Sequence, residues 1–266
     1  MNLDAPTATA APTDFAPPAP PLPREAALFL DFDGTLVAIA PRPDAVVVEP
    51  WLLPTLERLR HALGGAVALV SGRRLVELDR FLAPLQLPAA GIHGIEWRDA
   101  LGALHRQPLE LPRTVKLRAQ RLAGLHPGLR VEDKQAALAL HWRQAPQLGG
   151  LCLRSLKSAV RPYPDWMVLL GKCVAEVKPA GIDKASALRE LRAGEPFARR
   201  LPIFVGDDAT DEDGFAAAQA CGGFGVKVGA GASCARFRLD NPQAVRRWLE
   251  DSLAALDGAV AVSPAG

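Results

Sequence analysis

Two apolar segments far apart in this chain each run directly into a cluster of carboxylates. Residues 28–35 read Leu-Phe-Leu-Asp-Phe-Asp-Gly-Thr, and residues 203–213 read Ile-Phe-Val-Gly-Asp-Asp-Ala-Thr-Asp-Glu-Asp. A short continuous apolar run is typical of a strand that is buried on both faces, as in a parallel sheet. Ligands of open α/β sheets bind beyond the carboxyl ends of such strands. The pattern therefore predicts an α/β fold with an acidic site at one edge of a parallel sheet.

The first segment delivers Asp31 and Asp33 to that edge, followed by Gly34 and Thr35. Strand alternation directs both carboxylates to one side, but the glycine indicates that the chain is already turning at Asp33. One carboxylate could then attack a substrate while the other transfers a proton. Taken alone, the segment is equally typical of a strand end with two solvated acids before a turn.

The second segment decides between these interpretations. Its carboxylates would repel those of the first segment unless a cation lay among them, and an all-oxygen ligand set suits Mg²⁺. Part of the acidic run has a simpler explanation, because Glu212 and Asp213 fit the acidic first turn of a helix. We therefore assign Asp207, Asp208 and Asp211 to the chemistry of the site.

Two other segments supply positive charge and hydrogen-bond donors. A strand-like run over residues 66–70 ends on Ser71, Gly72 and Arg73, a pattern that suits an anion at a helix start but is also typical of a plain N-cap. A helix is predicted over residues 184–193, and Lys184 opens it. Most of the 31 basic residues are arginines, so lysines 134, 178 and 184 are candidates for sites that require a point charge.

Taken in order, Asp-x-Asp-Gly-Thr, Ser-Gly-Arg, Lys184 and Gly-Asp-Asp-x-Thr-Asp resemble the haloacid dehalogenase superfamily of Mg²⁺-dependent aspartate phosphatases, over residues 28–213. Three longer strings, at residues 91–96, at 131–134 with 141–143, and at 176–181, are similar to those of the trehalose-6-phosphate phosphatases. Ala185 and Ile95 depart from the family pattern, which usually has glycine at the first position and often a small residue at the second.

The resemblance implies a fold and a reaction. The fold is a Rossmann-like core, a parallel sheet flanked by helices, with a small α/β cap inserted between the second and third motifs. In such enzymes Asp31 would attack phosphorus and form an aspartyl phosphate. Asp33 would protonate the departing sugar oxygen and then activate water. Mg²⁺ would be held by Asp31, the main-chain carbonyl of Asp33 and Asp207.

The resemblance also assigns supporting residues. Ser71 and Lys184 would bind the transferring phosphoryl oxygens, next to Gly72 and Arg73 at the substrate. Asp208 and Asp211 would orient water molecules on the metal and the Lys184 ammonium group.

The chain divides into five predicted parts. Residues 1–23 are rich in Pro and Ala and are predicted to be disordered, and residues 257–266 to be a flexible tail. The catalytic core is predicted over residues 24–104 and 178–256, and the cap over 105–177. Within the cap we expect helices near 112–124 and 147–160 and strands over 130–142 and 167–177.

The cap is expected to select the substrate, because the core motifs provide only phosphoryl chemistry. Glu132, Lys134 and Glu176 lie at positions that bind sugar hydroxyls in the resembled family. Glu132 and Lys134 are two residues apart on a predicted strand and so share a face, although such a pair is also typical of a solvated strand edge. His93 and Arg143 are weaker candidates.

Composition excludes several other partners. The net charge is only +2, no segment is dense in lysine and arginine, and no apolar run reaches the length of a membrane span, so neither nucleic acid nor membrane is an expected partner. The four cysteines lack metal-binding spacing and suit reduced thiols in the cytoplasm. A monomer is the working expectation for oligomeric state.

Three functions remain open. The first is hydrolysis of trehalose 6-phosphate. The second is a phosphatase or mutase of the same fold that acts on mannosylphosphoglycerate, sucrose phosphate or a hexose phosphate, because fold and core motifs do not fix the substrate. The third is a non-catalytic sugar-phosphate-binding regulatory protein, which would be expected to lack Asp31 or Asp33; both are present.

Overall fold

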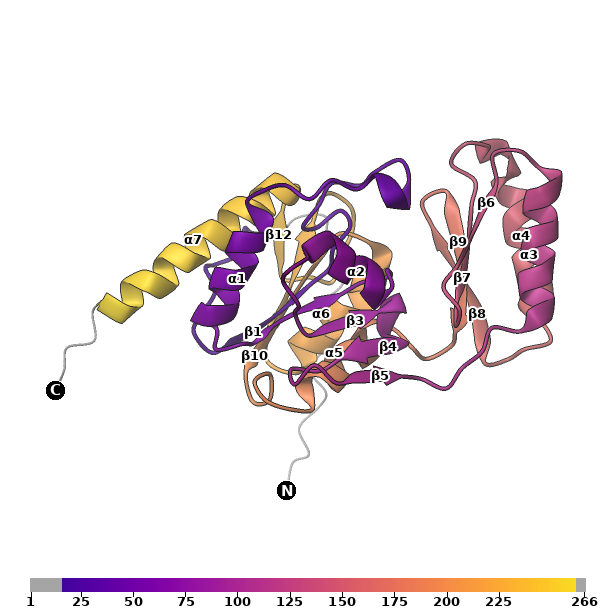
Figure 1. Ribbon diagram of the computed structural model, residues 1–266. Coiled ribbons are helices and arrows are strands. Elements are labelled where there is room, and N and C mark those ends of the chain that lie inside the picture. Colours follow the sequence, from indigo (N-terminus) through magenta and orange to yellow (C-terminus); the bar gives the residue numbers. More distant parts are fainter. Residues whose placement is uncertain (1–15, 262–266) are drawn as a thin grey trace, which may run out of the picture.

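A computed structural model of the chain describes residues 16–261, which form a larger and a smaller α/β unit side by side (Figure 1). The larger unit contains an eight-stranded sheet with strand order β12-β11-β10-β1-β2-β3-β4-β5. Its strands are β1 (Ala26–Leu30), β2 (Val67–Val70), β3 (Ala89–Gly91), β4 (Glu96–Arg98), β5 (Leu104–Arg106), β10 (Leu201–Gly206), β11 (Phe224–Val228) and β12 (Phe237–Leu239). Its helices are α1 (Leu52–Ala62), α2 (Leu75–Leu82), α5 (Lys184–Arg192), α6 (Glu212–Ala220) and α7 (Pro242–Ala261).

Strand β1 lies at the centre of this sheet and is buried on both faces. Ala26, Leu28 and Leu30 pack in a hydrophobic cluster with α1, α2 and α7. Ala27 and Phe29 pack in a second cluster, with α5 and α6, on the opposite face. Helices on both faces explain why the sequence of β1 is a continuous apolar run, and they confirm the predicted α/β class.

The parallel pairing of β1 positions the polar residues that follow the strands. β1 lies between β10 and β2 and pairs with both in parallel. The carboxyl ends of these three neighbours therefore meet at one edge of the sheet. Asp31, Ser71 and Asp207, each the first residue after its strand, are brought together there.

The smaller unit has a four-stranded antiparallel sheet with order β6-β7-β9-β8. Its helices α3 and α4 lie on the side of this sheet that faces away from the larger unit (Figure 1). The bounds are α3 (Arg113–Leu125), β6 (Arg130–Asp133), β7 (Leu138–His141), α4 (Gly149–Val160), β8 (Trp166–Gly171) and β9 (Val174–Pro179). The helices lie close to the predicted ranges.

Both strands predicted for the smaller unit are in fact hairpins. The range 130–142 contains β6 and β7, and the range 167–177 falls on β8 and β9. The turns include Gln135 at φ 69° and Cys173 at φ 63°. Neither residue type is a strong turn signal, because left-handed backbone is usually adopted by glycine or asparagine, and the sequence analysis therefore predicted one strand in each range.

The predicted limits of the inserted segment each cut a strand. Residue 104 begins β5, which pairs antiparallel with β4 and keeps the chain in the larger sheet through Arg106. Residue 177 lies inside β9, which pairs with β8 as far as Pro179. Main-chain pairing therefore moves both limits about two residues toward the C-terminus.

The prediction of disorder over residues 1–23 is wrong for residues 16–23; residues 1–15 lie outside the described part. Leu22 is only 3% exposed, and its backbone N–H donates to Ser252 Oγ at 3.1 Å. Trp248 Nε1 donates to the carbonyl of Pro20 at 2.8 Å. One apolar side chain and two hydrogen bonds to α7 thus hold a segment whose composition resembles a disordered tail.

The predicted C-terminal tail also begins too early. Helix α7 continues to Ala261, and Asp257 pairs with Arg58 of α1 at 2.9 Å. Residues 262–266 lie outside the described part. Within residues 16–261, no helix is both long and apolar enough to cross a membrane.

The docking of the N-terminal segment can be tested with Leu22→Ala. We expect the free energy of unfolding to fall by about 2 to 3 kcal/mol, because a buried leucine is replaced by a cavity. Leu101→Ala is the control, since Leu101 is 94% exposed and its truncation should change stability by less than about 0.5 kcal/mol. Denaturant titration of both variants measures the difference, and equal stabilities would contradict the packing of Leu22.

Candidate active site

Lys184 joins two buried carboxylates at the edge of the larger sheet. Its Nζ donates to Asp31 Oδ1 at 2.8 Å and to Asp211 Oδ1 at 2.5 Å. Lys184 is the first residue of α5, and Asp183 caps that helix by accepting from the Ser186 N–H at 2.7 Å. The cap fixes where the helix starts and so directs the lysine into the carboxylate cluster.

Burial shapes the ionisation of this cluster. It raises the pKa of Asp31 well above its ordinary value, because attraction by Lys184 does not offset desolvation and repulsion by Asp211 and Asp207. Burial and the nearby Asp211 raise the pKa of Asp207 to about 7. Burial alone would lower the pKa of Lys184, but the attraction of Asp211 and Asp31 outweighs it and raises that pKa. The single Lys184 ammonium group therefore does not balance the charge of the three carboxylates.

The cluster has the donor set of a divalent cation site. Carboxylate oxygens of Asp31, Asp207 and Asp211 all lie within 4.8 Å of one another. Hard oxygen donors suit Mg²⁺, and a cation there would relieve the repulsion that raises the two aspartate pKa values. Both oxygens of Asp211 are engaged, one by Lys184 Nζ and the other by the Asp208 N–H, so Asp31 and Asp207 are the carboxylates available to a cation.

Asp208 supports this arrangement through its backbone. Its N–H donates to Asp211 Oδ2 at 2.9 Å, and its own Oδ1 accepts from the Ala209 N–H at 2.8 Å. These bonds fix the short turn Ala209–Asp211 at the start of α6. Asp208 therefore orients the carboxylate that holds Lys184.

Gly34 permits the close approach of the first and last motifs. Its φ is +82°, and a Cβ at this position would lie 2.1 Å from Asp207 Oδ2. Only glycine both adopts this conformation readily and leaves room for the carboxylate. The glycine in the first motif therefore has a steric role in the acidic cluster as well as a role in the turn.

Ser71, Gly72 and Arg73 follow β2 and lie beside the carboxylates. Ser71 is 1% exposed, and its Oγ accepts from the Arg73 N–H at 3.2 Å. The Arg73 guanidinium forms a fork with Asp33, with Nε 2.5 Å from Oδ2 and Nη2 2.7 Å from Oδ1. The family resemblance assigned Arg73 to the substrate, and nothing in the sequence predicted its pairing with Asp33.

The smaller unit contributes a second charged group. Lys134 Nζ donates to Glu176 Oε2 at 3.0 Å and to the carbonyl of Gly72 at 2.8 Å, which connects the two units. Glu132 Oε2 lies 2.8 Å from His141 Nε2. The predicted sugar-binding residues are thus buried or half-buried and face the larger unit, unlike a solvated strand edge.

Burial and the Lys134 charge together set the ionisation of this group. Burial alone would raise the pKa of Glu176, but Lys134 and His93 lower it well below its usual range. His93 Nε2 lies 3.5 Å from Glu176 Oε2, and burial lowers the pKa of this histidine. The second oxygen of Glu176 and Nδ1 of His93 are buried without a hydrogen-bond partner among the described residues. Both residues line the pocket between the units.

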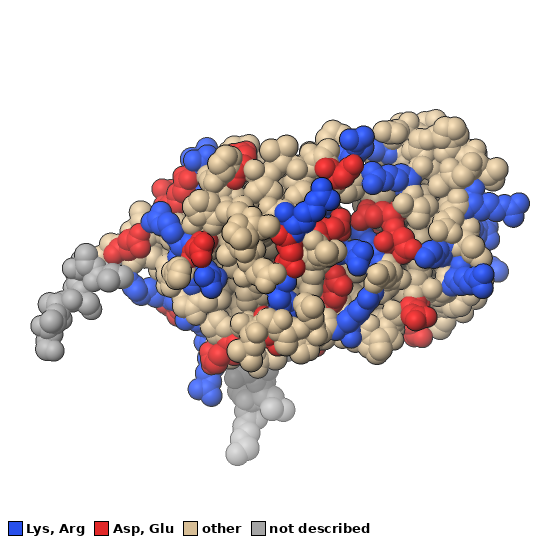
Figure 2. Space-filling model, in the orientation of Figure 1, with Lys and Arg blue, Asp and Glu red and all other residues tan. Residues whose placement is uncertain are grey.

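A single pocket of about 480 Å³ joins the two groups. Two residues singled out from the sequence do not line it: Asp211, which is fully buried behind Lys184, and Lys178, which donates to the carbonyl of Ile182. The residues that line it are Asp31, Asp33, Ser71, Gly72, Arg73, Lys184, Asp207 and Asp208 from the larger unit and Glu132, Lys134 and Glu176 from the smaller. Figure 2 shows acidic and basic side chains gathered where the units meet.

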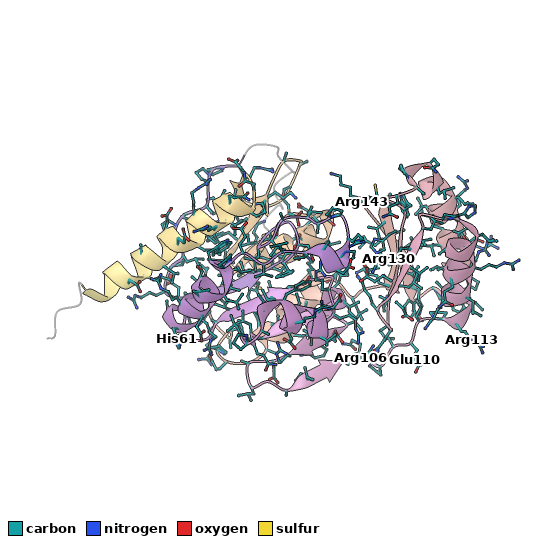
Figure 3. All side chains as sticks on the ribbon, turned by 45° about the horizontal axis from the view of Figure 1, so that its top comes forward. His61, Arg106, Glu110, Arg113, Arg130 and Arg143 are labelled. Carbon is teal, nitrogen blue, oxygen red and sulfur yellow. The ribbon has the colours of Figure 1, made fainter. Side chains whose placement is uncertain are left out.

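Other parts of the pocket were missed or ranked low from the sequence. Residues 39–43 and Val46 line one wall, although their proline-rich sequence indicates only a loop. Arg143 also lines the pocket, and Arg130 pairs with Asp44 of the loop at 3.6 Å. Figure 3 shows Arg130 and Arg143 on the side of the smaller unit that faces the larger one, and Arg113 on the outer side. The contact between the loop and the smaller unit cannot be predicted from the local sequence of either segment.

The steric role of Gly34 can be tested against a matched glycine. We expect Gly34→Ala to weaken Mg²⁺ binding at least ~10-fold, because the new methyl group would displace Asp207. Gly102 has φ +84°, and no atom lies within 4 Å of the place that a methyl group would take there, so Gly102→Ala carries the same backbone strain without the clash. Calorimetric titration should show normal binding in Gly102→Ala, and equal affinities in the two variants would refute the steric argument.

Comparison with known proteins identifies the family. The family model described as Trehalose-phosphatase matches residues 29–243. The trehalose-6-phosphate phosphatase of Escherichia coli (strain K12) is 41% identical over 233 residues, which covers 87% of this chain and 88% of that protein. The C-terminal domain of Candida albicans trehalose-6-phosphate phosphatase has the same fold, with a TM-score of 0.78 at 22% identity, over 91% of this chain and 99% of that one. A haloacid dehalogenase-like hydrolase from Bacteroides thetaiotaomicron also shares the fold, with a TM-score of 0.61 at 18% identity, over 84% of this chain and 98% of that one. The chain belongs to the trehalose-phosphatase family.

Proposed function

We propose that this protein is a Mg²⁺-dependent phosphatase that hydrolyses trehalose 6-phosphate to trehalose and phosphate. The observation that carries the proposal is the pocket between the units. The Asp31 carboxylate, which we assign as the nucleophile, lies in this pocket with charged side chains that suit a ligand with many hydroxyl groups. The names of the E. coli and C. albicans relatives support the choice of trehalose 6-phosphate as substrate.

The reaction proceeds in two displacements. A carboxylate oxygen of Asp31 attacks phosphorus as the bond from phosphorus to the sugar oxygen breaks, and Asp33 gives its proton to that oxygen. Water then attacks the aspartyl phosphate. Asp33 takes a proton from the water, the bond from phosphorus to Asp31 breaks, and phosphate leaves with both aspartates restored.

The remaining core residues hold charge and geometry. Asp31, Asp207 and the main-chain carbonyl of Asp33 would hold Mg²⁺. The ion, when bound, neutralises phosphoryl oxygens that would otherwise repel the attacking carboxylate. Ser71 and Lys184 donate hydrogen bonds to the transferring group.

The smaller unit acts in this proposal as a cap that selects the substrate, and residues 16–106 with 180–261 as the catalytic core. Glu132, Lys134 and Glu176 bind sugar hydroxyls, and the Lys134 bond to Gly72 brings them over the phosphoryl site. The position of these three side chains in the lining of the pocket supports this role. A cytoplasmic monomer remains the expectation from sequence.

A phosphatase or mutase for another sugar phosphate shares the core chemistry, so the substrate requires a direct test. We expect the kcat/KM for phosphate release with Mg²⁺ to be highest for trehalose 6-phosphate in a panel with sucrose phosphate, mannosylphosphoglycerate and glucose 6-phosphate. A higher value for another member would replace the proposed substrate. Absence of phosphate release from every member would favour the non-catalytic binder.

Mg²⁺ affinity should depend on pH near neutrality. Asp207 has a pKa of about 7 without metal, and it binds Mg²⁺ only as a carboxylate. The ion must therefore displace a proton below that pH. We expect affinity to fall by up to about tenfold per pH unit between about pH 7 and about pH 6. Calorimetry in buffers of different ionisation enthalpy measures both affinity and proton release, and a constant affinity over this range would contradict the assignment.

Glu132 offers the cleanest test of the cap. Removing Lys134 or Glu176 would leave its partner charged and buried, which lowers stability as well as binding. Glu132→Ala should lower kcat/KM for trehalose 6-phosphate, because it removes a hydrogen bond to the sugar worth about 1.5 to 3 kcal/mol of free energy. The value for p-nitrophenyl phosphate, which has no sugar hydroxyls, should change little.

The matched control for Glu132 is Asp133→Ala. Asp133 is the next residue on β6, but it pairs with Lys116 of α3 at 2.5 Å on the other side of the strand. Its removal should leave the ratio of kcat/KM for the two substrates unchanged. If Glu132→Ala leaves the ratio unchanged as well, Glu132 has no part in substrate selection.

A further inference from the structure

The guanidinium of Arg73 is held by a carboxylate, a carbonyl and an aromatic ring. Besides the fork to Asp33, Nη1 donates to the carbonyl of Pro43 at 3.0 Å. The guanidinium carbon lies 4.9 Å from the ring centre of Phe81, and only 9% of the side chain is exposed. These contacts fix the plane of the fork, and the fork fixes the plane of the carboxylate that accepts from it.

Asp33 needs such a partner more than Asp31 does. Asp31 is buried and held by Lys184. Asp33 lies in the turn beyond β1, and 35% of its side chain is exposed, so packing alone does not set its direction. A proton donor acts only within hydrogen-bond reach of the leaving oxygen.

We propose that Arg73 is a positioning residue for Asp33 rather than a ligand of the phosphoryl group. Three of its N–H groups are already engaged, two by Asp33 and one by Pro43. The inference rests on the proposed function, in which Asp33 protonates the sugar oxygen. It assigns Arg73 an indirect part in sugar release, through the orientation of the Asp33 carboxylate.

The two roles of Arg73 predict different dependence on the leaving group. Trehalose is a poor leaving group without a proton, whereas p-nitrophenolate leaves without one. A misplaced proton donor therefore slows the hydrolysis of trehalose 6-phosphate but not that of p-nitrophenyl phosphate. Loss of a side chain that binds the phosphoryl group slows the hydrolysis of both substrates.

The test is the ratio of kcat/KM for the two substrates in Arg73→Gln. We expect the ratio of trehalose 6-phosphate to p-nitrophenyl phosphate to fall by about 10²-fold, the size of effect that a misplacement of about 1 Å can have. Arg73→Lys retains the charge but has no planar fork, so we expect it to behave like Arg73→Gln. An unchanged ratio in Arg73→Gln, or full rescue by lysine, would overturn the proposal.

Arg98→Gln is the matched control for loss of a buried arginine. Arg98 also forms a fork, with Asp79 at 2.8 and 2.7 Å, and its side chain is also 9% exposed. It lines a separate groove beside α2 and not the pocket between the units. Its loss should leave the ratio unchanged, so a fall as large as that of Arg73→Gln would assign the effect to general destabilisation and overturn the proposal.

A double-mutant cycle with Asp33→Asn completes the test. If Arg73 acts through Asp33, adding Arg73→Gln to Asp33→Asn should change the ratio no further. A full additional fall would overturn the proposal. If the wild-type protein does not hydrolyse trehalose 6-phosphate, the proposed function fails separately, and the same ratio is then measured with whichever sugar phosphate the panel identifies.

Discussion

The structure depends on the placement of one ammonium group between buried carboxylates. Lys184 contacts Asp31, directly after β1, and Asp211, in the short turn between β10 and α6, two segments that are far apart along the chain. Without it, the parallel pairing of β10 with β1 would bring the carboxylates of Asp207 and Asp31 together in a poorly solvated space. With it, one oxygen of Asp31 is held in place, while the Asp207 carboxylate has no salt bridge in the part of the chain that the structure describes. In the proposed mechanism, this one pairing thus orients the attacking group and leaves a site for the metal ion.

The sequence predicted that these residues would lie together, because several of them directly follow strands. A continuous apolar run identifies a buried parallel strand, and the next residue then lies at the ligand-binding edge of the sheet. Asp31, Ser71 and Asp207 could therefore be grouped from pattern alone, and α5 begins at the predicted Lys184. These features are local in sequence and depend on tertiary structure only through strand order.

The features that the sequence did not predict depend on contacts between distant segments. The fork between Arg73 and Asp33 joins residues 40 apart, and Leu22 is ordered by α7 rather than by its own composition. The hairpins of the smaller unit turn at Gln135 and Cys173, residue types that rarely adopt a positive φ. In each case tertiary contacts override a local preference, which a reading of neighbouring residues cannot detect.

The central claim is that Asp31 becomes phosphorylated during turnover of trehalose 6-phosphate. It is tested most directly by stopping the reaction with acid at steady state and mapping peptides by mass spectrometry, with Asp31→Asn as the control. We expect phosphate on the peptide that contains Asp31, at that residue, and neither phosphate nor turnover in Asp31→Asn. Phosphate on a different residue, or normal turnover in Asp31→Asn, would contradict the account.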